Sequence, residues 1–236
     1  MLLSLLRSGN ANIIAVIMYI LSSLLTIFLV LPLHECAHGF VAYKLGDNTA
    51  KRQGRLTLNP IAHIDYLGAA LLLLIGFGWA KPVPINARNF KNEKVGMAIS
   101  ALAGPVSNLI AAIVAGLIQN GLIVLIVKGI LPMGPVIANM PVMEYVLLFF
   151  QFLIMINIGL AVFNFLPIPP LDGSKIMMAF LPNKAIMWIY EREHIISMVL
   201  FIVVMMGGLN GILNRADDIF YSFISWLTWL PYSALV

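Results

Sequence analysis

Long apolar stretches separated by short polar segments dominate the pattern of this chain. The first apolar run extends from about Asn12 to Leu33, and two more cover Gly96 to Ile126 and Pro141 to Phe165. A helix of about twenty consecutive apolar residues is long enough to cross a bilayer. We therefore predict one membrane-spanning helix in each of these three runs.

Two further apolar stretches lie near the C-terminus. Ile195 to Leu213 has the length of another span, whereas Asp217 to Val236 is rich in aromatic residues. Aromatic-rich segments cross a membrane or lie at its interface with water. With the three spans above, the total is about five to six transmembrane helices, the higher number applying if the short apolar segment at residues 66–80 also crosses.

The segment from Tyr66 to Ala80 is apolar but short, at about fifteen residues. Basic residues cluster before it and after it, namely Lys44, Lys51, Arg52 and Arg55, then Lys81, Arg88, Lys91 and Lys94. Basic residues gather on the cytoplasmic side of membrane proteins, so a crossing here would put one cluster on the wrong side. We interpret the segment as re-entrant.

Two polar stretches beside this segment predict short strands. Lys51 to Asn59 alternates polar and apolar residues at its end, and Lys81 to Asn89 carries two prolines that confine it to a sheet edge. We therefore expect a small re-entrant or β-hairpin element near the active site. An edge strand at Lys81 to Asn89 could pair with an extended peptide.

Composition agrees with a protein built for the membrane. Hydrophobic residues make up 61% of the chain, charged residues 10%, and the mean hydropathy is +0.97. No soluble domain of this length has that balance, so the predicted fold class is an all-α polytopic membrane protein. The net charge of +4 then marks topology and does not indicate nucleic acid. We expect a single transmembrane domain over residues 1–236, with its core at about 12–182.

The chemistry centres on the segment HECAH at residues 34–38. His34 and His38 are four residues apart, so on a helix they project from the same face. Two imidazoles at this spacing can share a zinc ion, and Glu35 beside them can take a proton from a zinc-bound water. A single cysteine, Cys36, excludes both an internal disulfide and a multi-cysteine zinc site.

A second polar group lies where prolines interrupt the run that ends near Phe165. Asp172 follows this break, and broken backbone at membrane depth is tolerated where it lines a cavity. If two crossings separate His38 from Asp172, both lie on the same side of the membrane. Two imidazoles and one carboxylate would leave a fourth zinc position for water, as in a catalytic site.

The motifs resemble those of the site-2 protease family of intramembrane zinc peptidases, in its compact form without a PDZ or CBS domain. Besides residues 34–38, the matches are NxxPxxxLDG at residues 164–173, GPxxN at 104–108 and the Asn-Pro turn at 59–60. The resemblance implies one Zn²⁺ per chain on His34, His38 and Asp172, with Glu35 as the catalytic base. It also implies that Asn164 helps to place the substrate or the oxyanion.

Asn108 carries a polar side chain at membrane depth and needs a partner. Both a helix–helix hydrogen bond and a role in substrate binding are open at this stage. The function implied is regulated cleavage of peptide bonds in or near transmembrane segments of membrane proteins. The expected partners are such a substrate and the lipid bilayer. The expected location is a prokaryotic plasma membrane, with the active site toward the cytoplasm.

Two other functions use the same residues. A metal transporter could pass ions across His34, His38 and Asp172, but no series of acidic or histidine residues follows along the other spans. A non-catalytic relative could bind membrane helices as a scaffold, but such relatives usually lose the glutamate or a ligand, and here all are present. The sequence therefore favours the peptidase.

Overall fold

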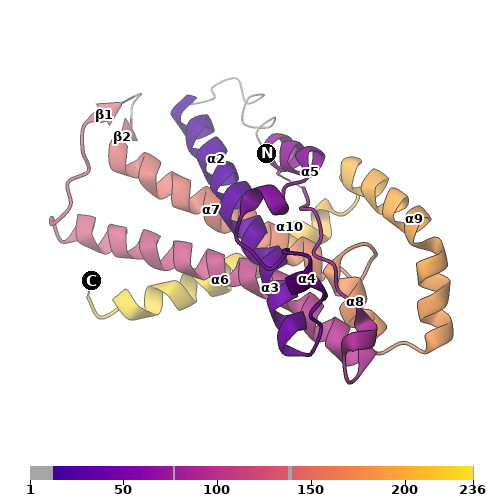
Figure 1. Cartoon of the computed structure of the whole chain (residues 1–236). Helices are drawn as coiled ribbons and strands as arrows, with labels where there is room; N and C mark the ends of the chain where they lie inside the picture. Colours follow the sequence, from indigo (N-terminus) through magenta and orange to yellow (C-terminus); the bar gives the residue numbers. More distant parts are fainter. Residues whose placement is uncertain (1–12, 77, 138–139, 236) are drawn as a thin grey trace.

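Helices make up nearly all of the regular structure in the computed structural model of the chain (Figure 1). The structure describes residues 13–76, 78–137 and 140–235. The helical part of the predicted fold class is therefore confirmed. Three helices are long and apolar enough to cross a membrane, or four if a bent pair near the C-terminus counts as one span. This criterion gives fewer spans than the five to six expected.

The first span is a single helical run in three parts. It consists of α2 (Ile13–Leu25), the π-helical turn η1 (Thr26–Val30) and α3 (Leu31–Lys44). The sequence placed the end of the apolar run at Leu33, but the helix continues to Lys44. The HECAH segment therefore lies inside a helix, where both neighbouring turns hold it in place.

Two long helices form the centre of the molecule and lie side by side in Figure 1. They are α6 (Glu93–Val127) and α7 (Val142–Phe165). Asn92 caps the start of α6, and its side chain accepts a hydrogen bond from Val95 N at 3.2 Å. Helix α3 packs against α6 and α2 against α7. The core has two apolar clusters that α7 shares, one with α2 and the other with α6 and the C-terminal helix.

Between α3 and α6 the chain makes a short excursion. It contains α4 (Thr49–Arg52), the 3₁₀ turn η2 (Pro60–Ala62), α5 (Tyr66–Ile75) and the 3₁₀ turn η3 (Ala87–Asn89). Asp65 caps α5 through Gly68 N at 2.9 Å. Lys81 N then donates to His63 O at 2.7 Å, so the chain leaves and returns at one place. This geometry suits a segment that re-enters without crossing.

The predicted strands beside the active site are wrong. Residues 51–59 contain the end of α4 and turns, and residues 81–86 are extended but pair with no strand among the described residues. The described sheet has two strands, β1 (Val136–Ile137) and β2 (Met140–Pro141), in the loop between α6 and α7. The prolines near Lys81 disfavour a ladder, and side chains bind its backbone instead.

The C-terminal part differs from the expected span at Ile195 to Leu213. Helix α9 (Asn183–Met205) ends inside that stretch, and α10 (Asn210–Trp229) leads into the 3₁₀ turn η4 (Leu230–Tyr232). The two helices meet at 80°. Gly207 has a φ of 74° at the break, a conformation that favours glycine and ends the helix. Hydropathy alone could not reveal this bend.

Candidate metal centre and active site

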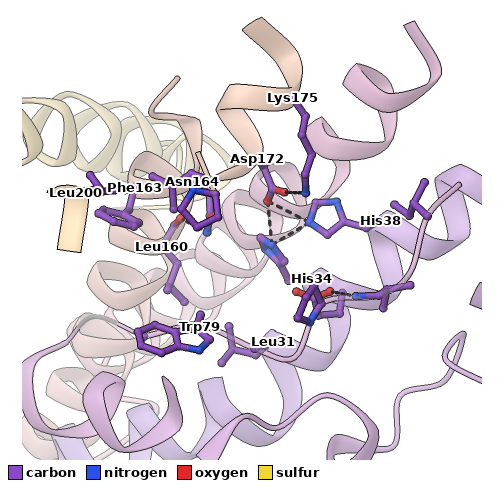
Figure 2. A pocket seen from close by; sticks show the side chains of 18 of the residues that line it. Leu31, His34, His38, Trp79, Leu160, Phe163, Asn164, Asp172, Lys175 and Leu200 are labelled. Atoms are coloured by element: carbon purple, nitrogen blue, oxygen red, sulfur yellow. Dashed lines mark hydrogen bonds and ion pairs between the residues drawn. The ribbon is translucent and has the colours of Figure 1, made fainter. Parts of the chain in front are cut away.

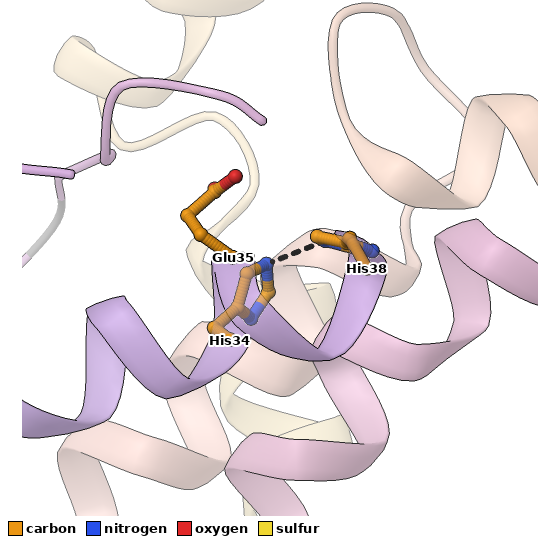
Figure 3. Close-up of side chains that lie close together, drawn as sticks. All are labelled: His34, Glu35 and His38. Atoms are coloured by element: carbon orange, nitrogen blue, oxygen red, sulfur yellow. Dashed lines mark hydrogen bonds between the residues drawn. The ribbon is translucent and has the colours of Figure 1, made fainter. Parts of the chain in front are cut away.

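The two histidines of α3 face each other on one side of the helix (Figure 3). Their Nε2 atoms are 3.0 Å apart, and the ring planes cross at 84°. Both side chains are buried, each with 5% of its surface exposed. The spacing of four residues thus brings two ring nitrogens to one point, as the sequence predicted.

Asp172 completes this cluster from a different part of the chain (Figure 2). It is the first residue of the short helix α8 (Asp172–Met178), just after the proline-rich break that follows α7. Its Oδ2 atom lies 3.3 Å from His34 Nε2 and 3.1 Å from His38 Nε2. Lys175 binds the other oxygen, Oδ1, at 3.2 Å. One carboxylate oxygen therefore faces the histidines.

The outer nitrogens of the two rings are held by acceptors on α6. His34 Nδ1 lies 2.6 Å from Asn108 Oδ1, and His38 Nδ1 lies 2.7 Å from Ser100 O. A carbonyl or amide oxygen accepts hydrogen bonds, so in each ring Nδ1 is the protonated nitrogen that donates. The lone pairs of both Nε2 atoms then point toward Asp172.

This donor set fits a divalent metal ion. Three electron-pair donors converge in a buried space, where they would repel one another without a positive charge between them. His34, Glu35 and His38 offer ligand atoms within 4.8 Å of one another. Imidazole and carboxylate are common zinc ligands, and hydrogen bonds to the outer nitrogens are typical of metal-bound histidine.

Helix α6 fits closely over the histidines at Gly104. A Cβ atom at this position would lie 2.3 Å from His38 Nε2 and 2.5 Å from His34 Nε2. No side chain larger than hydrogen fits there unless the rings move. Pro105 follows inside the helix. The Gly-Pro pair identified in the sequence therefore allows α6 to approach the metal centre.

Glu35 projects beside the histidines (Figure 3). Its Oε2 accepts a hydrogen bond from Val83 N at 2.8 Å, and 8% of the residue's surface is exposed. Val83 belongs to the extended segment that follows α5. A single backbone donor thus fixes one carboxylate oxygen, while the group still lines the cavity described next.

A cavity of about 350 Å³ opens onto this cluster. One part of its wall carries Glu35, both histidines, Asp172 and Lys175. The other part is apolar and comes from several elements, with Leu31, Trp79, Leu160, Phe163, Leu200 and Phe201 (Figure 2). The arrangement suits a polypeptide whose side chains are apolar and whose backbone meets the polar groups.

The two asparagines singled out in the sequence occupy different places. Asn164 lines the cavity, and its amide nitrogen donates to Leu160 O at 2.9 Å. Asn108 is fully buried behind His34 and also donates to Asn157 Oδ1 at 3.5 Å. Asn108 thus makes a hydrogen bond between helices and is not among the residues that line the cavity.

Sequence reasoning missed several supporting groups. Ser100 contributes a backbone oxygen, Val83 a backbone N–H, and Asn157 and Lys175 their side chains. Lys175 and Asn157 were visible as polar residues in or beside apolar stretches, which is a usable signal. The backbone groups gave none, because any residue has them.

A comparison with known families covers both chain segments that form this cluster. The model of the family described as Peptidase family M50 matches residues 22–208, a range that contains His34, His38 and Asp172. A Bacillus subtilis (strain 168) protein named "Putative zinc metalloprotease YwhC" is 40% identical over 181 residues, covering 75% of this chain and 78% of that protein.

A second relative, from Mycolicibacterium smegmatis, is named "Putative zinc metalloprotease Rip2". It is 34% identical over 91 residues, which is 35% of this chain and 34% of that protein. No solved structure matches the chain. The family is therefore shown by sequence similarity alone.

Proposed function

The chain belongs to peptidase family M50, and from this premise we propose that it is an intramembrane zinc protease. It cleaves peptide bonds in or near the transmembrane segments of membrane-protein substrates. The observation that carries the proposal is the convergence of His34, His38 and Asp172 between apolar helices, with Glu35 beside them. The names of both relatives support zinc as the metal.

We assign His34, His38 and Asp172 as the zinc ligands. Bound zinc supplies a Lewis acid, which makes a water molecule nucleophilic near neutral pH. Glu35 takes the proton of the attacking water and returns it to the amine that leaves. Asn164 faces the same cavity, where its side chain can help to place the scissile carbonyl.

The substrate reaches Glu35 as an extended strand. A transmembrane helix keeps its carbonyls in internal hydrogen bonds, so it must unwind before hydrolysis. Ile85 N–H, in the extended segment that lines the cavity, has no hydrogen-bond partner among the described residues. It is free to pair with such a peptide. Ile85→Pro should therefore reduce cleavage without removing zinc, and unchanged turnover would exclude this pairing.

Asn86→Pro does not test the same point. Its N–H donates to Asp47 Oδ2 at 2.7 Å, so proline would break an internal contact. Of these two neighbouring N–H groups, only that of Ile85 is therefore available to a substrate.

We place the active site toward the cytoplasmic side of the membrane. The metal-binding helix α3 ends at Lys44, and Lys51 and Arg52 follow in α4 with exposed side chains. Basic residues next to spans favour the cytoplasmic side. Tagging either side of α4 with a cysteine-reactive probe in intact cells and in inverted vesicles would test the orientation.

A metal transporter fits the structure less well. The described residues hold one group of three or more potential ligands, at residues 34–38. Ion transit needs successive sites, and the second candidate function therefore has no specific support. Zinc uptake into proteoliposomes would be the observation in its favour.

The decisive experiment measures zinc in purified protein for wild type, Glu35→Ala and Asp172→Ala. We expect about one zinc per chain in the first two and a large loss in the third, because only the third removes a ligand. Cleavage of fluorescein-labelled casein, an unstructured polypeptide, should require Glu35. A folded Asp172→Ala protein that keeps its zinc would refute the ligand assignment. Wild type that takes up no metal would refute the protease.

A further inference from the structure

The segment of residues 81–89, which we call the arm, is extended up to Asn86 and ends in the 3₁₀ turn η3. It lies over the active site without belonging to a sheet. Among the described residues it pairs with no strand, so no ladder sets its position. Yet its Val83 N–H makes the hydrogen bond to the Glu35 carboxylate. Contacts other than strand pairing must therefore keep Val83 N–H in place.

One end of the arm is held by an arginine. Arg55 Nη2 lies 2.9 Å from Lys81 O and 3.2 Å from Pro82 O. Arg55 itself is anchored by its own N–H, which donates to Ala50 O at 2.9 Å. The guanidinium therefore binds the two carbonyls that immediately precede Val83.

The other end is held by a buried aspartate. Asp47 has no exposed surface, and its Oδ2 accepts from Asn86 N at 2.7 Å. Its Oδ1 accepts from the side-chain amide of Asn89 at 2.7 Å and from Thr49 N at 3.0 Å. Burial would raise the pKa of Asp47, but these hydrogen bonds outweigh it and hold the pKa below its usual value. The group is thus a charged acceptor that needs the arm's donors.

Both holding residues come from the short stretch directly after the metal-binding helix. Asp47 N donates to Ala42 O of α3 at 2.9 Å, which ties the turn to that helix. The middle of the arm also packs on α3, since a Cβ added at Gly39 would lie 3.1 Å from Val83 Cγ1. Helix, turn and arm therefore form one closed unit around Glu35.

We propose that Asp47 and Arg55 are positioning residues for catalysis, which clamp the two ends of the arm and keep Val83 N–H on Glu35. The inference rests on the proposed protease function, in which Glu35 is the base. Neither residue touches the metal ligands, and neither lines the cavity. Their effect on the reaction passes through the arm.

The contacts with the arm depend on the two oxygens of the Asp47 carboxylate and on the shape of the Arg55 guanidinium. An asparagine at position 47 keeps one oxygen but turns an NH₂ group toward one of the two donors from the arm. In either orientation one arm contact is lost. Lysine at position 55 keeps the charge but binds as a point donor, so it can hold one carbonyl better than two.

The test uses the purified full-length protein with labelled casein as the probe. We compare wild type, Asp47→Asn, Arg55→Ala and Arg55→Lys with Arg52→Ala, a matched control that removes an exposed arginine of α4. In Asp47→Asn and Arg55→Ala we expect kcat to fall by about ten- to a hundredfold, since small misplacements of a catalytic group cost that much. KM and zinc per chain should stay within about twofold of wild type, and Arg55→Lys should recover part of the lost kcat.

The outcomes separate this inference from the function on which it rests. If wild type binds zinc and cleaves casein, but Asp47→Asn and Arg55→Ala keep the wild-type kcat, the clamp is overturned and the protease stands. The clamp is also overturned if both variants lose zinc or if KM alone changes, because the two residues would then act on folding or on substrate binding. A wild-type protein without zinc or cleavage overturns both proposals.

Discussion

The two walls of the cavity are built in opposite ways. On the polar wall, both histidines, Glu35 and Asp172 each have a hydrogen-bond or ion-pair partner from another element, and all are buried. The wall formed by α9 contributes Leu200, Phe201 and Val204 through apolar contact. In all of α9, only Ile189 and Leu200 are buried.

One wall holds the groups for metal binding and proton transfer, and the other provides apolar contact. Groups that share a metal and move a proton need fixed positions, because small displacements cost much of the rate. A wall that meets apolar side chains needs only a complementary surface, since apolar contact has no direction. Figure 1 shows α9 standing apart from the central helices, in agreement with this division. Substitutions on the two walls should therefore differ in kind.

The largest effect is expected at the proton-transfer group. Glu35→Gln keeps an oxygen that can accept from Val83 N–H but removes the base, so casein cleavage should fall by about 10²- to 10⁴-fold. Zinc content should stay unchanged. Glu93→Gln, at the exposed start of α6, is the matched control. Turnover close to wild type would show that the polar wall does not contain the base.

A methyl group at Gly104 should damage the metal centre next most strongly. Its Cβ would fall within 2.5 Å of both Nε2 atoms, so Gly104→Ala must displace a ligand or the helix. We expect zinc affinity to fall by about a hundredfold, measured by competition with a chelator. Gly159→Ala in α7 is the control, because nothing lies within 4 Å of its added methyl group. Equal affinity in both variants would show that α6 fits more loosely than described.

Asn108→Ala tests the support of a single ligand. It removes the acceptor of His34 Nδ1–H, so the ring loses its orientation, and zinc affinity should fall by about ten- to a hundredfold. Asn120→Ala is the matched control, since Asn120 binds Thr228 further along the same helix. If cleavage were lost with zinc affinity intact, Asn108 would act on the substrate after all.

A smaller change is expected from the α9 wall. Val204→Ala should leave zinc content unchanged and raise KM by no more than about tenfold, since each methylene-sized contact is worth about 0.8 kcal/mol. Met198→Ala, at an exposed position of the same helix outside the cavity, serves as control. A loss of zinc in Val204→Ala would contradict the separation of the two walls.

The smallest effect concerns acid stability. Because the pKa of Asp47 is lower in the folded chain, its stabilising contribution is present above about pH 4 and is lost as pH falls through the lower folded value. The difference in melting temperature between wild type and Asp47→Asn should therefore shrink in acid. A difference that stays constant down to pH 2 would contradict this assignment.

The parts that the sequence could predict depend on local spacing or on the lengths and charges of apolar runs. His34, Glu35 and His38 lie within five consecutive residues, and a helix alone brings them together. Asp172 was reached by counting crossings, which needs only span lengths and charges. The apolar length of α6 and α7 likewise determined their identity as spans.

The parts that failed depend on contacts between distant segments. Residues 81–89 were predicted to form an edge strand, but Arg55 and Asp47 bind backbone groups that a ladder would use. The break at Gly207 lies in an apolar run whose hydropathy alone gives no sign of the 80° bend. The exclusion of Asn108 from the cavity follows from the packing of α6 on α3, which no local pattern encodes.

The π-helical turn at Thr26–Val30 sets the direction in which the active site faces. Such a turn holds one more residue than an α-helical turn, and each residue of an α-helix rotates the side chains by about 100°. On one side of the turn, Ser22 binds α7 through Phe149 O at 2.8 Å, and on the other the histidines meet α6. Deleting one residue from the turn would therefore swing the histidines about a quarter of a revolution away from their partners. The extra residue of the π-helical turn therefore sets the rotation of α3, which carries the histidines, relative to α2, which is anchored on α7.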